Sequence, residues 1–126
     1  MNVASFQKAH RAVAYLTASQ RETFLCIARL IVKPITKREL RKLASANAIY
    51  RVPKSAQTYC DHVRKLIDLG LLAQDESDSQ VVLLTPLGAS AREYLIEELR
   101  ERVEREELQA SATLKTSGVP DDRGTR

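Results

Sequence analysis

The sequence contains few of the residues from which metal sites are built. It has two cysteines, Cys26 and Cys60, and two histidines, His10 and His62. A structural zinc site needs four nitrogen or sulfur ligands at short spacings, and neither cysteine belongs to a Cys-x-x-Cys pair. We therefore expect no metal site and no cofactor. Both cysteines fall in apolar helical patterns and are predicted to be buried, although a disulfide between them stays open.

Sequence patterns typical of enzymes and membrane proteins are also missing. Four glycines leave little room for a phosphate-binding loop, and neither His-Glu-x-x-His nor Gly-x-Ser-x-Gly occurs. No run of about 18 apolar residues is present, and residues 1–16 lack the apolar core of a secretory signal. We expect a cytoplasmic protein that is not an enzyme and does not bind a membrane.

Aromatic residues are scarce, and charge is unevenly distributed. With no tryptophan and 5% aromatic residues, the single modest core is expected to consist of Leu, Ile, Val and Ala. Residues 1–72 carry 13 Lys and Arg against 4 Asp and Glu, a difference of +9. Residues 73–126 carry 7 against 12, a difference of −5. This distribution predicts that the first part meets a polyanion and that the second part has another role.

Apolar periodicity predicts four helices in the first part of the chain, the first over about residues 4–16. Capping boxes at Ser19–Glu22 and Thr36–Glu39 open the next two, and Pro34 ends the second. Ser55 is the expected N-cap of the fourth, which runs to Leu69 and is followed by Gly70 as a C-terminal cap. Phe6, Ala9, Val13 and Leu16 share one face of the first helix, and Phe24, Ile27, Ala28 and Ile31 form an apolar stripe on the second. The positions expected to point inward are Leu40, Leu43 and Ala44 in the third helix and Tyr59, Val63, Leu66 and Ile67 in the fourth.

The period then changes to that of strands. Residues 71–74 and 80–84 are predicted to form a β-hairpin around the polar turn 75–79. Thr85 and Pro86 begin a helix that is expected to run to about Gln109. Residues 110–126 are polar and are predicted to be disordered.

Two segments resemble winged helix-turn-helix regulators of the MarR and PadR type. Residues 55–72 (SAQTYCDHVRKLIDLGLL) resemble the recognition helix and first wing strand, and residues 82–88 (VLLTPLG) the second wing strand and the entry to the next helix. The resemblance implies a mainly α fold with a small β-hairpin wing. It implies a DNA-binding domain over residues 17–86, between a dimer-supporting helix at 1–16 and a long C-terminal dimerisation helix at 87–109.

The resemblance also implies double-stranded DNA as the partner, with the helix 55–69 in the major groove. Gln57 would read adenine, Lys54 and Lys65 would meet phosphates, and the N–H groups that begin the preceding helix would bind another phosphate. The residues expected to contact DNA are Thr36, Lys37, Arg38, Arg41, Lys42, Lys54, Ser55, Gln57, Thr58, Asp61, His62 and Lys65. One feature departs from the family, whose wing tip often carries Arg or Lys: Asp75, Glu76 and Asp78 stand here, so no wing contact with DNA is expected.

The last predicted helix has an apolar strip longer than one small domain needs. It either folds back on its own domain or pairs with the same helix of a second chain, where flanking Glu and Arg residues can form cross-chain pairs. We expect a homodimer, with recognition helices about 34 Å apart on a palindromic site. The expected interface consists of Phe6, Val13, Leu87, Ala91, Tyr94, Leu95, Leu99 and Val103.

Three functions follow as hypotheses. The first is a sequence-specific transcriptional regulator. The second is a plasmid or chromosome segregation protein that spreads along DNA, or a replication adaptor, with a protein partner at the acidic wing or the last helix. The third is a winged helix that serves purely as a protein-interaction module, against which the basic third helix and Gln57-Thr58 argue.

Overall fold

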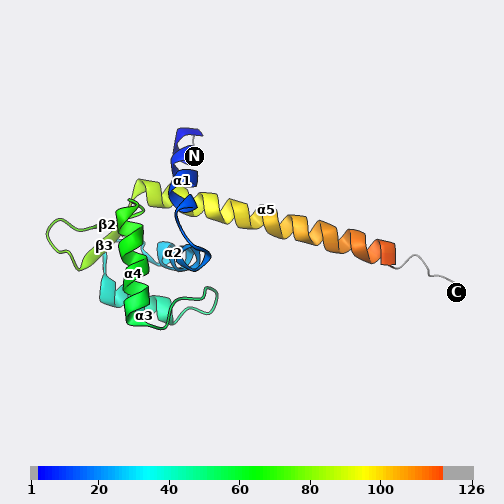
Figure 1. Ribbon diagram of the computed structural model, residues 1–126. Coiled ribbons are helices and arrows are strands. Elements are labelled where there is room, and N and C mark those ends of the chain that lie inside the picture. The colour runs from blue at the N-terminus through cyan, green and yellow to red at the C-terminus, as the bar shows by residue number, and fades with distance from the viewer. Residues whose placement is uncertain (1–2, 118–126) are drawn as a thin grey trace. The chain divides into compact units, whose positions relative to one another are not determined.

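The structure of the chain is a computed structural model that describes residues 3–117 (Figure 1). It is mainly helical with one small antiparallel sheet of three strands. The elements are α1 (Val3–Ala14), α2 (Ala18–Leu30), β1 (Ile35–Thr36), α3 (Lys37–Ser45), α4 (Ala56–Asp68), β2 (Leu72–Gln74), β3 (Val81–Leu84) and α5 (Pro86–Ser117). The chain divides into two compact units, Met1–Leu95 and Ile96–Arg126. The first unit thus takes in α1 and the start of α5, which the sequence patterns assign to separate segments.

Helix α2 begins two residues earlier than predicted, so the prediction of a capping box at Ser19–Glu22 is wrong. The box is formed instead by Thr17, whose hydroxyl accepts from the N–H of Gln20 at 3.1 Å, while the Gln20 side chain accepts from the Thr17 N–H at 2.9 Å. Thr17 and Gln20 have the same spacing as the predicted pair. Glu22 accepts a hydrogen bond from the backbone N–H of Arg51 at 2.7 Å, and so ties α2 to the connection between α3 and α4.

The core lies where α2 contacts both α3 and α4. The apolar stripe predicted for α2 is buried along its whole length. Leu43 is the exception among the predicted core residues of α3, because 41% of it is exposed while Leu40 and Ala44 are fully buried. In this nine-residue helix the buried stripe runs through the i, i+4 pair, and Leu43 projects to one side of it. The largest fully buried side chains are Phe24, Ile27, Leu40, Leu66, Leu71, Leu72 and Val82.

Both ends of α4 form as the sequence predicts. The Ser55 hydroxyl accepts from the N–H of Thr58 at 3.3 Å, which caps the first turn. At the other end Gly70 has a φ of 79°, and the N–H groups of Gly70 and Leu71 donate to the carbonyls of Ile67 and Leu66. These two bonds are the Schellman arrangement, which directs the chain straight into β2.

The sheet has one strand that the sequence analysis did not predict. The predicted hairpin is present, with Leu72 opposite Leu84 and Gln74 opposite Val82. Strand β1 pairs with the other edge of β3, which gives the order β1-β3-β2. Two residues, Ile35 and Thr36, are too few to produce a periodic signal, and their pairing depends on a strand about 45 residues further along the chain.

The start of α5 closes the first unit. The Thr85 hydroxyl accepts from the N–H of Gly88 at 2.9 Å, and its own proton points to the carbonyls of Gly70 at 2.5 Å and Leu71 at 3.0 Å. Further along the helix, Tyr94 meets α1: its hydroxyl is 2.6 Å from Nδ1 of His10, and its ring meets Phe6 edge-on at 4.9 Å. Polar and aromatic contacts therefore both join α1 to this segment.

In the second unit, the described residues continue α5 to Ser117. Residues 110–117 are helical, so the prediction of disorder is wrong for them; residues 118–126 lie outside the described part. The exposed surface carries the ion pairs Glu97–Arg100 and Glu98–Arg102, at the i, i+3 and i, i+4 spacings that favour helix.

Candidate functional site

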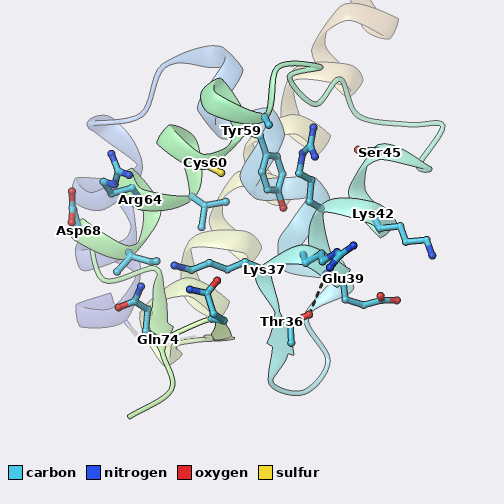
Figure 2. A pocket seen from close by; sticks show the side chains of 16 residues that line it. Thr36, Lys37, Glu39, Lys42, Ser45, Tyr59, Cys60, Arg64, Asp68 and Gln74 are labelled. Atoms are coloured by element: carbon cyan, nitrogen blue, oxygen red, sulfur yellow. Dashed lines mark hydrogen bonds between the residues drawn. The ribbon is translucent and has the colours of Figure 1, made fainter. Parts of the chain in front are cut away.

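An open groove of about 1080 Å³ runs between α3 and α4 (Figure 2). Its floor contains apolar groups from α4, including Val63 and Ile67, and two amide side chains from the hairpin, Gln74 and Gln80, line it as well. Five cationic side chains line the groove, against two carboxylates. The cations are Lys37, Arg38, Arg41, Lys42 and Arg64, and the carboxylates are Glu39 and Asp68. The groove is therefore a net positive surface within the first unit.

The backbone at the start of α3 is less available to a phosphate than predicted. The N–H of Lys37 donates to the carbonyl of Gln80 at 2.7 Å, and the N–H of Glu39 donates to the Thr36 hydroxyl at 3.1 Å. Two of the first three amides of α3 are thus used inside the protein. The positive charge of this end comes mainly from side chains, and Figure 2 shows Lys37 extending across the groove.

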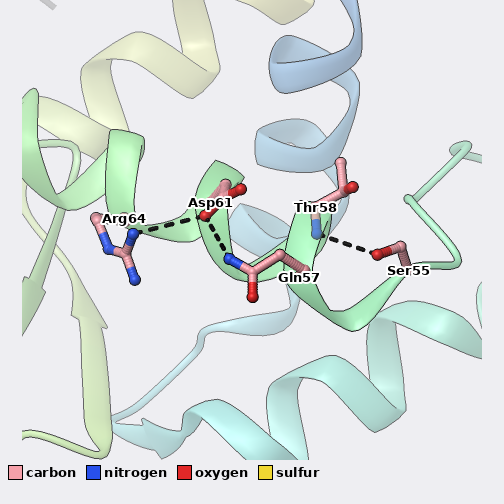
Figure 3. Close-up of polar contacts among 5 residues, drawn as sticks. All are labelled: Ser55, Gln57, Thr58, Asp61 and Arg64. Atoms are coloured by element: carbon pink, nitrogen blue, oxygen red, sulfur yellow. Dashed lines mark hydrogen bonds and ion pairs between the residues drawn. The ribbon is translucent and has the colours of Figure 1, made fainter.

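The exposed face of α4 carries a chain of polar contacts (Figure 3). The Gln57 amide donates to Asp61 Oδ1 at 3.0 Å, and the guanidinium of Arg64 lies 3.5 Å from the same oxygen. Residues four and three apart share a face of a helix, so the three side chains form one row. Asp61 thereby holds both the amide of Gln57 and the guanidinium of Arg64 in place.

Sequence reasoning missed Arg64, although its spacing from Gln57 and Asp61 is a signal that could have revealed it. The other predicted contacts of this region lie around the row. Lys54 and Thr58 are exposed, Lys65 is half-buried, and the Ser55 hydroxyl is used as the N-cap.

The prediction that His62 faces outward is wrong. Only 7% of His62 is exposed, and its Nδ1 lies 2.9 Å from the hydroxyl of Thr23, which is fully buried on α2. Burial lowers the pKa of His62, and the neighbouring Asp61 carboxylate opposes this shift. His62 follows Asp61 in the sequence, but its side chain contacts Thr23 on α2 and does not belong to the exposed row. It therefore links α2 to α4.

Cys60 is exposed and lines the groove, so the prediction that both cysteines are buried is wrong for it. Cys26 is buried as expected, and that burial raises the pKa of its thiol against the opposing charge of Arg29. Both thiols are free, so the possible disulfide does not form in this structure. Cys60 lies on the side of α4 that borders the groove, between the buried Tyr59 and the exposed Asp61 in the sequence.

Tyr59 is buried, as predicted, but its hydroxyl has no hydrogen-bond partner among the described residues. Burial raises the pKa of this hydroxyl, the two cysteine thiols raise it further, and the charge of Arg41 opposes them. Figure 2 shows the ring crossing from α4 toward α3 with the hydroxyl leading. A buried hydroxyl without a partner costs about 1–3 kcal/mol.

The residues predicted to form a dimer interface fall into two groups. Val13, Ala91 and Leu95 are buried within the first unit, so their apolar character needs no second chain to explain it. The remaining five are accessible at least in part: Phe6, Leu87, Tyr94, Leu99 and Val103.

The hairpin turn is acidic and locally ordered. Asp75 accepts hydrogen bonds from the hydroxyl and the N–H of Ser77, and these bonds lower the pKa of its carboxyl. Glu76 and Asp78 are exposed beside it. The turn therefore presents negative charge, in contrast to the groove.

No cluster of three metal-binding side chains is found within residues 3–117, and no helix there is long and apolar enough to span a membrane. No family model, no curated protein and no solved structure matches the chain.

Proposed function

We propose that the chain is a winged helix protein that binds double-stranded DNA as a homodimer in the cytoplasm and regulates transcription. The element order α2-β1-α3-α4-β2-β3, with β1 on the outer edge of β3, is compatible with that fold. In this reading α4 enters the major groove, which is wide enough for one helix. The β2–β3 hairpin is the wing, and its acidic turn stays away from the phosphates.

One observation carries the proposal: the cationic face of α3 lies beside an exposed polar row on α4. Lys37, Arg38, Arg41 and Lys42 would contact the phosphates that flank the groove of DNA, and Gln57, Asp61 and Arg64 would meet base edges. Arg reads guanine, Gln reads adenine, and a carboxylate accepts from cytosine, so this row has the chemistry for direct readout.

The dimer is proposed from the second unit. Its helix exposes half of Val103, and Leu99 lies four residues earlier on the same face. The Glu–Arg pairs on the neighbouring positions are of the kind that flank helix pairs. A second copy of this helix would cover the exposed apolar side chains.

Titration of a fluorescent duplex tests DNA binding directly. The logarithm of the affinity should fall linearly with the logarithm of salt concentration, and the variant Lys37→Ala/Arg38→Ala should lose about 1.8 units of that slope, or 0.9 for each lost phosphate contact. Lys8→Ala is the matched control, because Lys8 is an exposed cation on α1 that does not line the groove. An unchanged slope in the double variant would contradict the assigned surface.

Footprinting on DNA that flanks the protein's own gene separates the possible roles. A short palindromic footprint that survives higher salt supports a regulator. A footprint that grows stepwise with protein concentration supports segregation or replication, in which the acidic turn has a protein partner. The absence of any protection would favour a protein-interaction module.

A further inference from the structure

The groove between α3 and α4 combines two features that DNA backbone contacts alone do not require. Apolar side chains of α4 form part of its lining, and Tyr59, which also lines it, has a buried hydroxyl without a partner among the described residues. Flat, exposed cationic surfaces are sufficient for phosphodiesters of a duplex. A concave site with an apolar floor and a few convergent polar groups is typical of small-molecule binding, and about 1080 Å³ is large enough for such a ligand.

The charges indicate the chemical class of ligand. Lys37 and Arg41 lie four residues apart, on one face of α3, and both line the groove. Lysine and arginine together favour a phosphate, which accepts charge-assisted hydrogen bonds from both. On the opposite helix, the half-buried Ile67 supplies an apolar surface suited to a flat ring, next to the buried Val63. Glu39 and Asp68 are the two carboxylates of the lining, so the cations exceed them by three.

We propose that this groove binds a small organic phosphate and that the bound ligand excludes DNA from α4. The phosphate would lie against Lys37 and Arg41 and accept a hydrogen bond from the Tyr59 hydroxyl. The ring would lie against Val63 and Ile67. Arg41 is half-buried and lies close enough to Tyr59 for its charge to act on the hydroxyl. The proposed contact requires that the side chains around the buried hydroxyl move when the phosphate binds. The competition with DNA rests on the proposed function, whereas ligand binding itself does not.

Cys60 provides a direct readout of occupancy. It lines the groove and is exposed, while Cys26 is buried and serves as an internal control. Adenosine monophosphate is the probe, and adenosine and inorganic phosphate are its two halves. The intact probe should slow alkylation of Cys60 by iodoacetamide at concentrations where neither half does, with ionic strength held constant by sodium chloride. Equal protection by phosphate alone, or none by any probe, would overturn the proposal.

Tyr59→Phe tests the role of the hydroxyl. Because the hydroxyl has no partner in the unliganded protein, the variant should melt at the same temperature or higher, yet bind the probe about five- to tenfold more weakly in calorimetry. Arg41→Gln should also weaken binding, and Lys8→Gln should not. If a folded Tyr59→Phe variant keeps the affinity of the wild type, the hydroxyl does not contact the ligand. If Arg41→Gln keeps it as well, the proposed site is wrong.

The same samples distinguish this inference from the proposed function. If the duplex binds and the probe neither binds nor displaces it, the ligand site is wrong and the DNA proposal stands. If the probe protects Cys60 and no duplex binds at low salt, the ligand site stands and the DNA proposal fails. Displacement of the duplex by the probe, at constant ionic strength, is the result expected when both are correct.

Discussion

The hydroxyl of Thr23 on α2 lies 2.9 Å from Nδ1 of His62 on α4, and both side chains are buried. Thr23 Oγ1 is also within 3.1 Å of the Ser19 carbonyl, which can only accept. The Thr23 hydroxyl therefore donates to the Ser19 carbonyl, and the hydroxyl oxygen accepts from the Nδ1–H of His62. This pair fixes the position of α4, the helix that carries the exposed polar row, against the core.

The Thr23–His62 contact predicts a dependence of stability on pH. Burial lowers the pKa of His62 below its ordinary value of 6.5, so the unfolded chain binds the proton more readily than the folded protein does. The stabilisation is present above pH 6.5 and is lost as the pH falls through the lower, folded-state pKa. The melting temperature should therefore decrease as the pH falls below 6.5, and His62→Gln should reduce this decrease. His10→Gln is the control, and an identical pH profile in wild type and His62→Gln would contradict the assignment.

The two glycines in the described part of the chain, Gly70 after α4 and Gly88 in the first turn of α5, should respond differently to alanine. A Cβ at Gly88 would overlap the backbone carbonyl of Leu71, which cannot move without disturbing β2, so Gly88→Ala should cost about 3 kcal/mol of unfolding free energy or more. At Gly70 a Cβ would lie 3.8 Å from Leu87 Cδ2, an ordinary contact, but φ is 79°, so Gly70→Ala should cost only about 1–2 kcal/mol. Urea unfolding of both variants measures the difference, and a smaller loss at Gly88 than at Gly70 would refute it.

The proposed DNA binding predicts an effect of Asp61→Asn. The carboxylate attracts Arg64 and repels phosphates, so its removal should strengthen binding to random duplexes by about two- to fivefold, the range for one exposed charge. Discrimination between sequences should fall, because Gln57 and Arg64 lose their shared partner. Anisotropy titrations with specific and random duplexes measure both effects. Glu104→Gln, which removes an exposed carboxylate from the second unit, should change neither quantity.

Val103→Glu should separate the proposed dimer into folded monomers. Half of Val103 is exposed in the single chain, so the added charge disturbs a partner helix more than the protein's own core. Light scattering should report the mass of one chain, with an unchanged circular dichroism spectrum. Gln109→Glu adds the same charge at an exposed position of the same helix and should leave the mass unchanged. Leu95 is unsuitable for this test because it is buried within the first unit.

Much of the secondary structure could be predicted from the sequence, because the signals that start and stop elements span only a few residues. The caps at Ser55 and Thr85 and the glycine at position 70 form as expected. Thr36 caps α3 by accepting from the N–H of Glu39, which is one of the two bonds of the predicted capping box. The error at α2 has the same local origin, since two capping patterns overlap there and only one can open the helix. The cationic face of α3 was also identified from spacing alone.

The tertiary structure decided which side of each helix is covered and which distant strands pair. His62 is predicted to be exposed and Cys60 to be buried, and the structure shows the reverse. On the same helix, His62 packs against α2, whereas Cys60 faces the open groove. The pairing of β1 with β3 likewise depends on segments far apart in the chain. A sequence by itself determines local hydrogen bonding and the periodicity of apolar residues, whereas burial and the shape of the groove arise only when separate elements pack together.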